Sequence, residues 1–97
     1  MIEMSTPFPQ VEEEDVLVEE LLDLESHDLV VFNDDINTFD HVINVLIRVC
    51  KHTREQAEQC TIIIHYKGKC AVKKGSQEEL KPMCEAILDE GIQATIV

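Results

Sequence analysis

The chain has 97 residues and a formal net charge of −12, with 20 Asp and Glu against 8 Lys and Arg. This length suits one domain with a single modest core, and no apolar run approaches the roughly 20 residues that cross a bilayer. The acidity argues against a nucleic-acid ligand, whose affinity depends on clustered Lys and Arg. Because the N-terminus also lacks the basic flank and apolar segment of a secretory signal, we expect a cytoplasmic protein with no membrane or nucleic-acid partner.

The negative charge is concentrated in one half of the chain. Residues 1–47 carry 13 Asp or Glu and no Lys or Arg, whereas residues 48–97 carry 7 acids and 8 bases, so the net charges are −13 and +1. Residues 1–27 combine an acidic run with two prolines and are typical of a flexible extension. We therefore predict an acidic N-terminal extension over residues 1–27 and a folded core domain over residues 28–97.

The first half of the core shows strand and helix patterns in turn. Residues 28–32 (DLVVF) predict a strand, and residues 38–51 predict a helix. The apolar face of this helix consists of Val42, Val45, Leu46 and Val49, at i, i+3, i+4 and i+7. Thr53 is a plausible N-cap for a second helix that runs to a turn at Gly68. Its apolar face consists of Ala57, Cys60, Thr61 and Ile64.

The second half begins with a strand over residues 69–73 (KCAVK). Ser76 and Glu79 then form the capping box of a third helix, which Gly91 ends as a C′ residue. Pro82 falls within this helix, where a proline removes one hydrogen bond and clashes with the preceding turn. We expect either a kink at Pro82 or a helix that starts late, near Lys81.

A closing strand over residues 92–97 (IQATIV) completes the order β-α-α-β-α-β. This order predicts an α+β fold, in which a small three-stranded antiparallel sheet is packed with three helices. The cysteines include no CxxC pair, so we expect free thiols that fill the core rather than disulfides. They are Cys50, Cys60, Cys70 and Cys84.

Asparagine and two carboxylates follow the first predicted strand directly, in the stretch VVFNDDINTF. Side chains alternate in an extended segment, so Asn33 and Asp35 are expected on one side and Asp34 on the other. Two acceptors side by side suit a primary ammonium group, which offers three donors and no acceptor. Turn chemistry is the alternative, with Asn37 or Thr38 capping the following helix.

His65 is the second residue with candidate chemistry, because it ends the most apolar run of the chain, in TIIIHYKGK. A histidine in such a place is often only a packing residue. Metal binding with Cys50, His52 and Cys60 is an alternative, although zinc sites usually contain a closer pair of ligands. Cysteine–histidine catalysis is a further alternative, but no cysteine lies in a strand-turn-helix setting typical of a nucleophile.

Together, the segments VVFNDDINTFDHVINVLIRV and QAEQCTIIIHYKGKCAV resemble the ClpS family of Clp protease adaptors. In that family an Asn-Asp-Asp signature follows the first strand, and a His-x-x-Gly-Lys motif or a close variant follows the second helix. The resemblance covers about residues 28–97. It implies a ClpS-like fold, which is related to the C-terminal domain of the ribosomal stalk protein.

The resemblance also implies an activity without catalysis or a cofactor. ClpS proteins bind N-degron proteins, which carry a destabilising first residue such as Leu, Phe, Tyr or Trp. They deliver these proteins to the N-domain of a Clp AAA+ unfoldase of the ClpA or ClpC type, which works with the ClpP peptidase. By this resemblance Asn33, Asp35 and His65 would hold the free α-amino group, with Asp34 nearby. The side-chain pocket would be walled by Phe39, Val42, Thr61, Ile64 and Ile92.

The sequence departs from the family pattern at two positions of the expected pocket, and also at Ile36, where members typically carry an aromatic residue, and in a shorter segment after His65. Phe39 stands where members typically carry a Met that gates the pocket, and Thr61 stands where many carry another Met. Two readings besides the N-degron adaptor therefore stay open. One is an interaction module of the same fold with lost or altered specificity, and the other is a small metal-binding or thiol protein.

Overall fold

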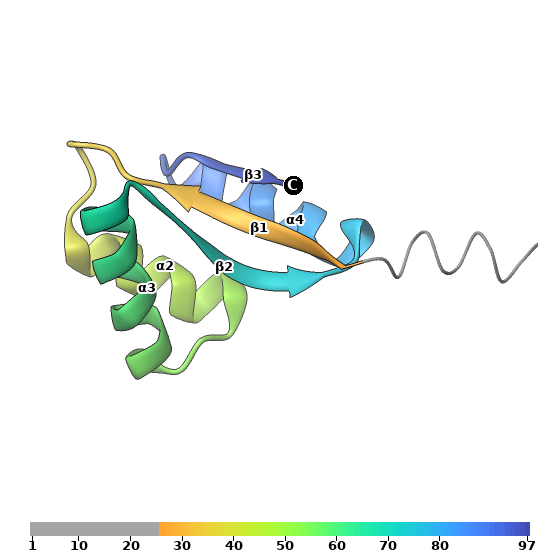
Figure 1. Cartoon of the computed structure of the whole chain (residues 1–97), viewed down its shortest axis with the longest axis horizontal. Coiled ribbons are helices and arrows are strands. Elements are labelled where there is room, and N and C mark those ends of the chain that lie inside the picture. The colour runs from red at the N-terminus through yellow and green to blue at the C-terminus, as the bar shows by residue number, and fades with distance from the viewer. Residues whose placement is uncertain (1–25) are drawn as a thin grey trace, which may run out of the picture.

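The structure, a computed structural model, describes residues 26–97, and these form three strands and three helices in the predicted order (Figure 1). The strands pair in one antiparallel sheet in the order β2-β1-β3. Their bounds are His27–Phe32 for β1, Lys69–Gly75 for β2 and Ala94–Ile96 for β3. The helices are α2 (Phe39–Cys50), α3 (Arg54–Lys67) and α4 (Gln77–Asp89). The predicted α+β fold is confirmed.

The sheet is built on β1, whose Leu29 and Val31 are 0% and 1% exposed. Alternate residues of a strand point to opposite faces, so these two side chains define the face that the helices cover. The pairing of β1 with β2 shifts register between Leu29 and Val30, where β2 contains one extra residue, Val72. This bulge interrupts the pairing, which continues on both sides of it, and the side-chain Nε2 of His52 donates to the Val72 carbonyl at 2.6 Å.

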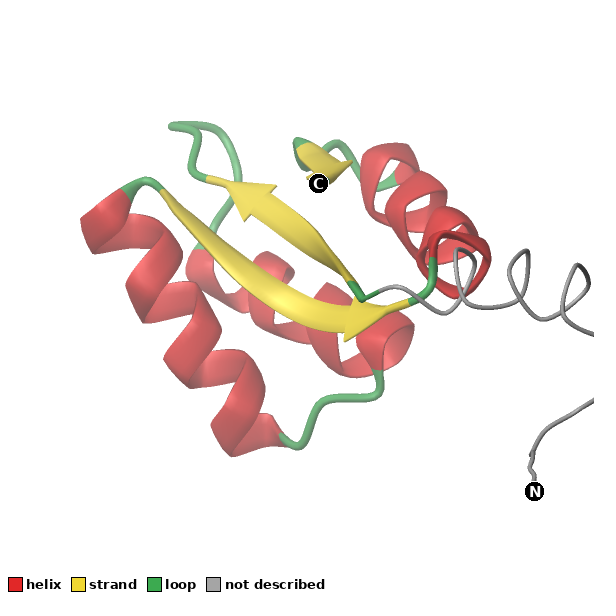
Figure 2. Ribbon diagram, turned by 45° about the vertical axis from the view of Figure 1, so that its right-hand side comes forward, coloured by secondary structure: helices red, strands yellow, loops and turns green. Residues whose placement is uncertain are grey.

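The predicted cap residues start all three helices. The Thr38 side chain accepts a hydrogen bond from the His41 backbone N–H at 3.1 Å and starts α2. Capping boxes start the other two helices, one from Thr53 and Gln56 and the other from Ser76 and Glu79. Figure 2 shows α2 and α3 lying side by side and α4 beside the edge strand β3.

The helix α4 corrects one expectation and confirms another. It begins at Gln77 and contains Pro82, so the predicted late start near Lys81 is wrong. The capping box already fixes the first turn, and Pro82 is exposed, so water can hydrate the backbone carbonyl that the proline leaves without a helical partner. Gly91 ends the helix at a φ of +82°, in the left-handed conformation expected of a C′ glycine.

One core lies between the sheet and the helices. The side chains buried most completely are Leu29, Val31, Val45, Leu46, Cys50, Leu80, Ile87 and Ile92. Cys50 and Cys84 are buried and Cys60 and Cys70 half-buried, and all four are free thiols. The predicted N-terminal extension lies outside the described residues except for its last two positions, of which His27 already belongs to β1.

Candidate functional site

A cavity of about 330 Å³ opens where the loop after β1 meets the start of α2 and the C-terminal half of α3. Eight of the nine site residues expected from the sequence line it. They are Asn33, Asp34, Asp35, Phe39, Val42, Thr61, Ile64 and His65, joined by Asn37 and Thr38. Ile92 does not line the cavity; it is 2% exposed and packs in the core.

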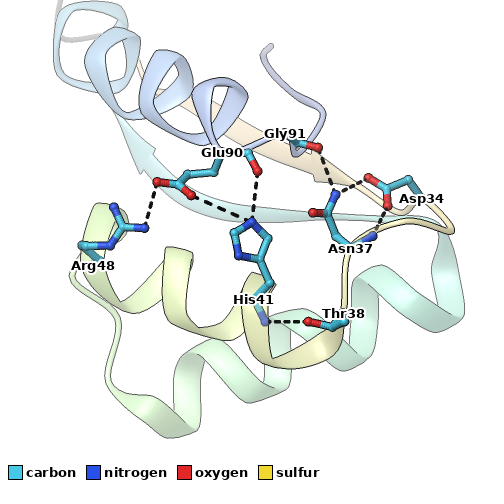
Figure 3. A network of polar contacts seen from close by, with 7 residues as sticks. All are labelled: Asp34, Asn37, Thr38, His41, Arg48, Glu90 and Gly91. Carbon is cyan, nitrogen blue, oxygen red and sulfur yellow. Dashed lines mark hydrogen bonds and ion pairs between the residues drawn. The ribbon is translucent and has the colours of Figure 1, made fainter.

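The loop at the cavity mouth is held by Asp34 (Figure 3). One carboxylate oxygen accepts hydrogen bonds from the backbone N–H groups of Ile36 at 2.9 Å and Asn37 at 2.8 Å. The other accepts from the Asn37 side-chain amide at 2.7 Å. These hydrogen bonds, first those from the backbone of Asn37 and Ile36, lower the pKa of Asp34 from its ordinary value of 3.8. Asp34 therefore shapes the loop from within.

Asn33 and Asp35 are both exposed on the cavity lining. The backbone N–H of Asn33 donates to the Gly68 carbonyl at 2.9 Å, which ties the start of the loop to the end of α3. Among the described residues, neither the side-chain amide of Asn33 nor the carboxylate of Asp35 has a hydrogen-bond partner. Their acceptor oxygens thus remain available to a ligand, unlike those of Asp34.

His65 reaches the same cavity from the last turns of α3. Its ring makes edge contacts with two aromatic rings, with centroids 5.2 Å away at Phe39 and 5.1 Å away at Tyr66. Phe39 begins α2 and is 42% exposed, so it forms part of the rim rather than of the core. The imidazole is thereby flanked by aromatic side chains at the polar end of the cavity.

The other end of the cavity is apolar and lies against the core. Val42 of α2 and Ile64 of α3 are 8% and 3% exposed. Thr61, one helical turn before His65, is 2% exposed and donates its hydroxyl hydrogen to the Ala57 carbonyl at 2.7 Å. The cavity therefore joins hydrogen-bond acceptors and an imidazole at its mouth to a buried, mainly apolar floor.

Sequence reasoning treated Asn37 only as a possible helix cap, and the structure gives it a second role (Figure 3). Its side-chain amide donates to Asp34 and also to the Gly91 carbonyl at 2.9 Å. Beside it, the Nε2 atom of His41 donates to the Glu90 carbonyl at 3.0 Å. These contacts join the site loop and the start of α2 to the C-terminal end of α4, 54 residues away from Asn37.

The residues weighed as metal ligands do not gather. Within residues 26–97 no group of three or more His, Cys, Asp or Glu side chains is placed to hold a metal ion. His52 uses one ring nitrogen on Val72, and Cys50 is wholly buried. The same residues include no helix long and apolar enough to span a bilayer.

Comparison of the chain with known families and proteins assigns it to a family. Residues 23–95 match the family described as "ATP-dependent Clp protease adaptor protein ClpS". The chain belongs to the ClpS family. It is 34% identical over 68 residues to the ATP-dependent Clp protease adapter protein ClpS of Thermosynechococcus vestitus, covering 69% of this chain and 72% of that protein. It is 28% identical over 67 residues to the ClpS of Streptomyces coelicolor, covering 69% and 70%.

A solved structure agrees with this assignment at the level of the fold. Agrobacterium tumefaciens ClpS2, solved bound to L-phenylalaninamide, superposes with a TM-score of 0.69 over 74% of this chain and 94% of that one, at 18% sequence identity. The modest identities place this chain among the divergent members of the family. As a ClpS-family adaptor, it has a Clp protease and the substrates of that protease as its partners.

Proposed function

We propose that this chain binds the free α-amino group and the bulky hydrophobic first residue of N-degron proteins, and delivers these proteins to the N-domain of a ClpA- or ClpC-type unfoldase in the cytoplasm. The observation that carries the proposal is the convergence of Asn33, Asp35 and His65 at the mouth of one cavity with an apolar floor. An α-amine has a pKa of about 7.7 to 8.0, so it is mostly cationic at pH 7 and matches two open acceptors.

The apolar floor supplies the second half of the recognition. Burying a large apolar side chain contributes about 1.5 to 3 kcal/mol, which is enough to favour Leu or an aromatic residue over Ala. The A. tumefaciens ClpS2 structure contains L-phenylalaninamide, a ligand with a free α-amine and an aromatic side chain. The α-amine of such a ligand would match the acceptors at the mouth and its ring would match the apolar floor, which supports the proposal.

Fluorescence polarisation with a peptide panel tests the proposal. The peptides differ only at residue one (Leu, Phe, Tyr, Trp, Ile, Val, Met or Ala), and each is made with a free and an acetylated N-terminus. We expect micromolar or tighter binding that needs both the free amine and a large first side chain. Flat, weak binding across the panel would favour an interaction module of the same fold without this specificity.

Variants then test the site residues. Asp35→Ala and His65→Ala should each abolish peptide binding while the far-ultraviolet circular dichroism stays unchanged. Asp89→Ala is the matched control, because Asp89 is exposed at the end of α4 and does not line the cavity. Binding by Asp35→Ala as tight as that of the parent would refute the site assignment.

Delivery needs a separate measurement, since binding alone does not establish it. In a degradation assay with a Clp unfoldase and ClpP, the full chain should accelerate loss of a fluorescent N-degron substrate. A chain lacking residues 1–26 should bind peptide as the parent does but fail to deliver. Equal delivery by the shortened chain would exclude a role for the extension.

A further inference from the structure

Thr61 is the only buried polar residue among those that the structure describes, and it lies in the floor of the cavity. The other floor side chains, Val42 and Ile64, are hydrocarbon. The Thr61 hydroxyl is satisfied within α3 by the Ala57 carbonyl, so it needs no partner from another element.

The hydrogen bond from Thr61 to Ala57 leaves the Thr61 hydroxyl able to accept a hydrogen bond from a ligand but not to donate one. A threonine hydroxyl has one hydrogen to donate and two lone pairs that accept. The hydrogen is used on the Ala57 carbonyl at 2.7 Å, and no donor among residues 26–97 bonds to the Thr61 oxygen. Within the described part of the chain, the floor thus holds one unused acceptor.

We infer that Thr61 makes the cavity selective for first residues with an apolar ring and a hydrogen-bond donor, tyrosine above all, over phenylalanine and leucine. This inference rests on the proposed N-degron function and names its preferred substrates. A tyrosine hydroxyl buried in the floor can donate to the remaining lone pair of the Thr61 oxygen, which offsets the loss of its bond to water, whereas phenylalanine and leucine have no donor and gain nothing from this oxygen.

The spacing along α3 agrees with a guest of this length. Thr61 and His65 are four residues apart, so they lie on one face of the helix about 6 Å apart along its axis. His65 borders the mouth, where the α-amine would sit, and Thr61 borders the floor. A tyrosine side chain spans a comparable distance from its Cα atom to its hydroxyl, which places the donor at the floor when the amine is at the mouth.

Peptides that differ only in the first side chain test the inference on the full chain. They begin with Tyr, Phe or O-methyltyrosine, and the last keeps the oxygen of Tyr but has no hydrogen to donate. We expect the Tyr peptide to bind roughly tenfold more tightly than the other two. This measurement needs no variant, so it is independent of any effect of mutation on folding.

Two substitutions then assign the preference to the hydroxyl. Thr61→Val has nearly the same shape without the oxygen and should bring the ratio of the Phe and Tyr dissociation constants close to one. Thr61→Ser keeps the oxygen and should retain a preference for Tyr. Thermal unfolding of each variant shows whether it is folded under the assay conditions.

The outcomes separate this inference from the proposed function. A Tyr preference that is lost in Thr61→Val and kept in Thr61→Ser supports the inference. Amine-dependent binding in which Tyr binds no better than Phe or O-methyltyrosine, or in which Thr61→Val leaves the ratio unchanged, overturns the inference and leaves the proposed function standing. Absence of amine-dependent binding to any peptide overturns both.

Discussion

Asp34 and Asn37 are joined by two hydrogen bonds, one from the Asn37 backbone at 2.8 Å and one from its side-chain amide at 2.7 Å. The second amide hydrogen of Asn37 bonds to the Gly91 carbonyl at 2.9 Å. The loop that carries Asn33 and Asp35 is thus fixed by its own middle residue and anchored to the end of α4. Of these three adjacent polar residues, Asp34 therefore shapes the loop, whereas Asn33 and Asp35 leave their side chains free on the cavity lining.

Replacing Asp34 and replacing Asp35 should have different consequences. Asp34→Ala removes three hydrogen bonds of the loop and should lower the free energy of unfolding by about 1 to 2 kcal/mol, with weaker peptide binding as a result. Asp35→Ala removes no side-chain hydrogen bond or ion pair with another described residue and should leave stability unchanged while binding is lost. Thermal unfolding and peptide binding, measured on both variants, check this. Equal melting temperatures for the two would contradict the structural role of Asp34.

Acid should loosen the same loop. The folded state lowers the pKa of Asp34 below its ordinary value of 3.8, so the folded state binds this proton less well than the unfolded state. The resulting stabilisation is present above pH 3.8 and is lost as the pH falls through the folded-state pKa. An NMR titration of the Ile36 and Asn37 amide signals should follow this loss, and Asp34→Asn should abolish the titration. Amide shifts that stay constant in the parent down to pH 2 would count against it.

Phe39 is expected to act on binding through His65. The Phe39→Leu substitution keeps an apolar side chain but removes the aromatic edge contact at 5.2 Å, and such contacts contribute about 0.5 to 1.5 kcal/mol. We expect peptide affinity to fall about threefold. A double-mutant cycle of Phe39→Leu with His65→Gln, measured as the free energy of unfolding, should show coupling, because either substitution alone already removes the contact between the two rings. If the effects of the two substitutions are additive, Phe39 does not act through His65 and contributes only as part of the cavity wall.

Local sequence signals predicted the fold well because they are physically local. Caps at Thr53 and Ser76 and the apolar faces of the helices each depend on residues a few positions apart, and they fixed the six elements in order. Most of the cavity lining was expected only through the resemblance to the ClpS family, which rests on two compact motifs, one in the loop after β1 and one at the end of α3. The bond from Asn37 to Gly91 has no such local signal, since it joins residues 54 positions apart.

Ile92 shows where the sequence pattern was insufficient. Its place in the pocket was expected only from the resemblance to the ClpS family, because no local pattern assigns this residue to the cavity or to the core. The backbone N–H groups of Ile92 and Gly91 bond back to the carbonyls of Ile87 and Leu88, and this C-terminal turn directs Ile92 into the core before β3 begins at Ala94. The position of this turn, rather than the periodicity of the sequence, places Ile92 in the core and not in the cavity.

Pro82 should reduce the stability of the domain. It lies inside α4, where its missing N–H leaves the Glu78 carbonyl without a helical partner, although both residues are exposed. Pro82→Ala should therefore raise the free energy of unfolding by about 1 to 3 kcal/mol, as measured by urea denaturation. Lys81→Ala is the matched control at the neighbouring exposed position and should change stability little. A destabilised Pro82→Ala protein would mean that the ring makes packing contacts worth more than the lost hydrogen bond.

The thiols of Cys50 and Cys60 should resist alkylation in the folded protein. Burial raises the pKa of Cys50 from 9.0 to about 11, and burial together with the neighbouring Cys70 thiol raises that of Cys60 to about 12. Because the reactive thiolate is rare at pH 8, iodoacetamide should label both far more slowly in buffer than in denaturant. Labelling as fast in buffer as in denaturant would show that the two thiols are not protected by the fold.

The same two thiols should make stability depend on pH. Since the folded state holds their protons more tightly than the unfolded state does, their contribution to stability is complete below pH 9 and is lost as the pH rises towards the folded-state pKa values. Unfolding free energies measured between pH 8 and 11 should decline less steeply in Cys60→Ala than in the parent.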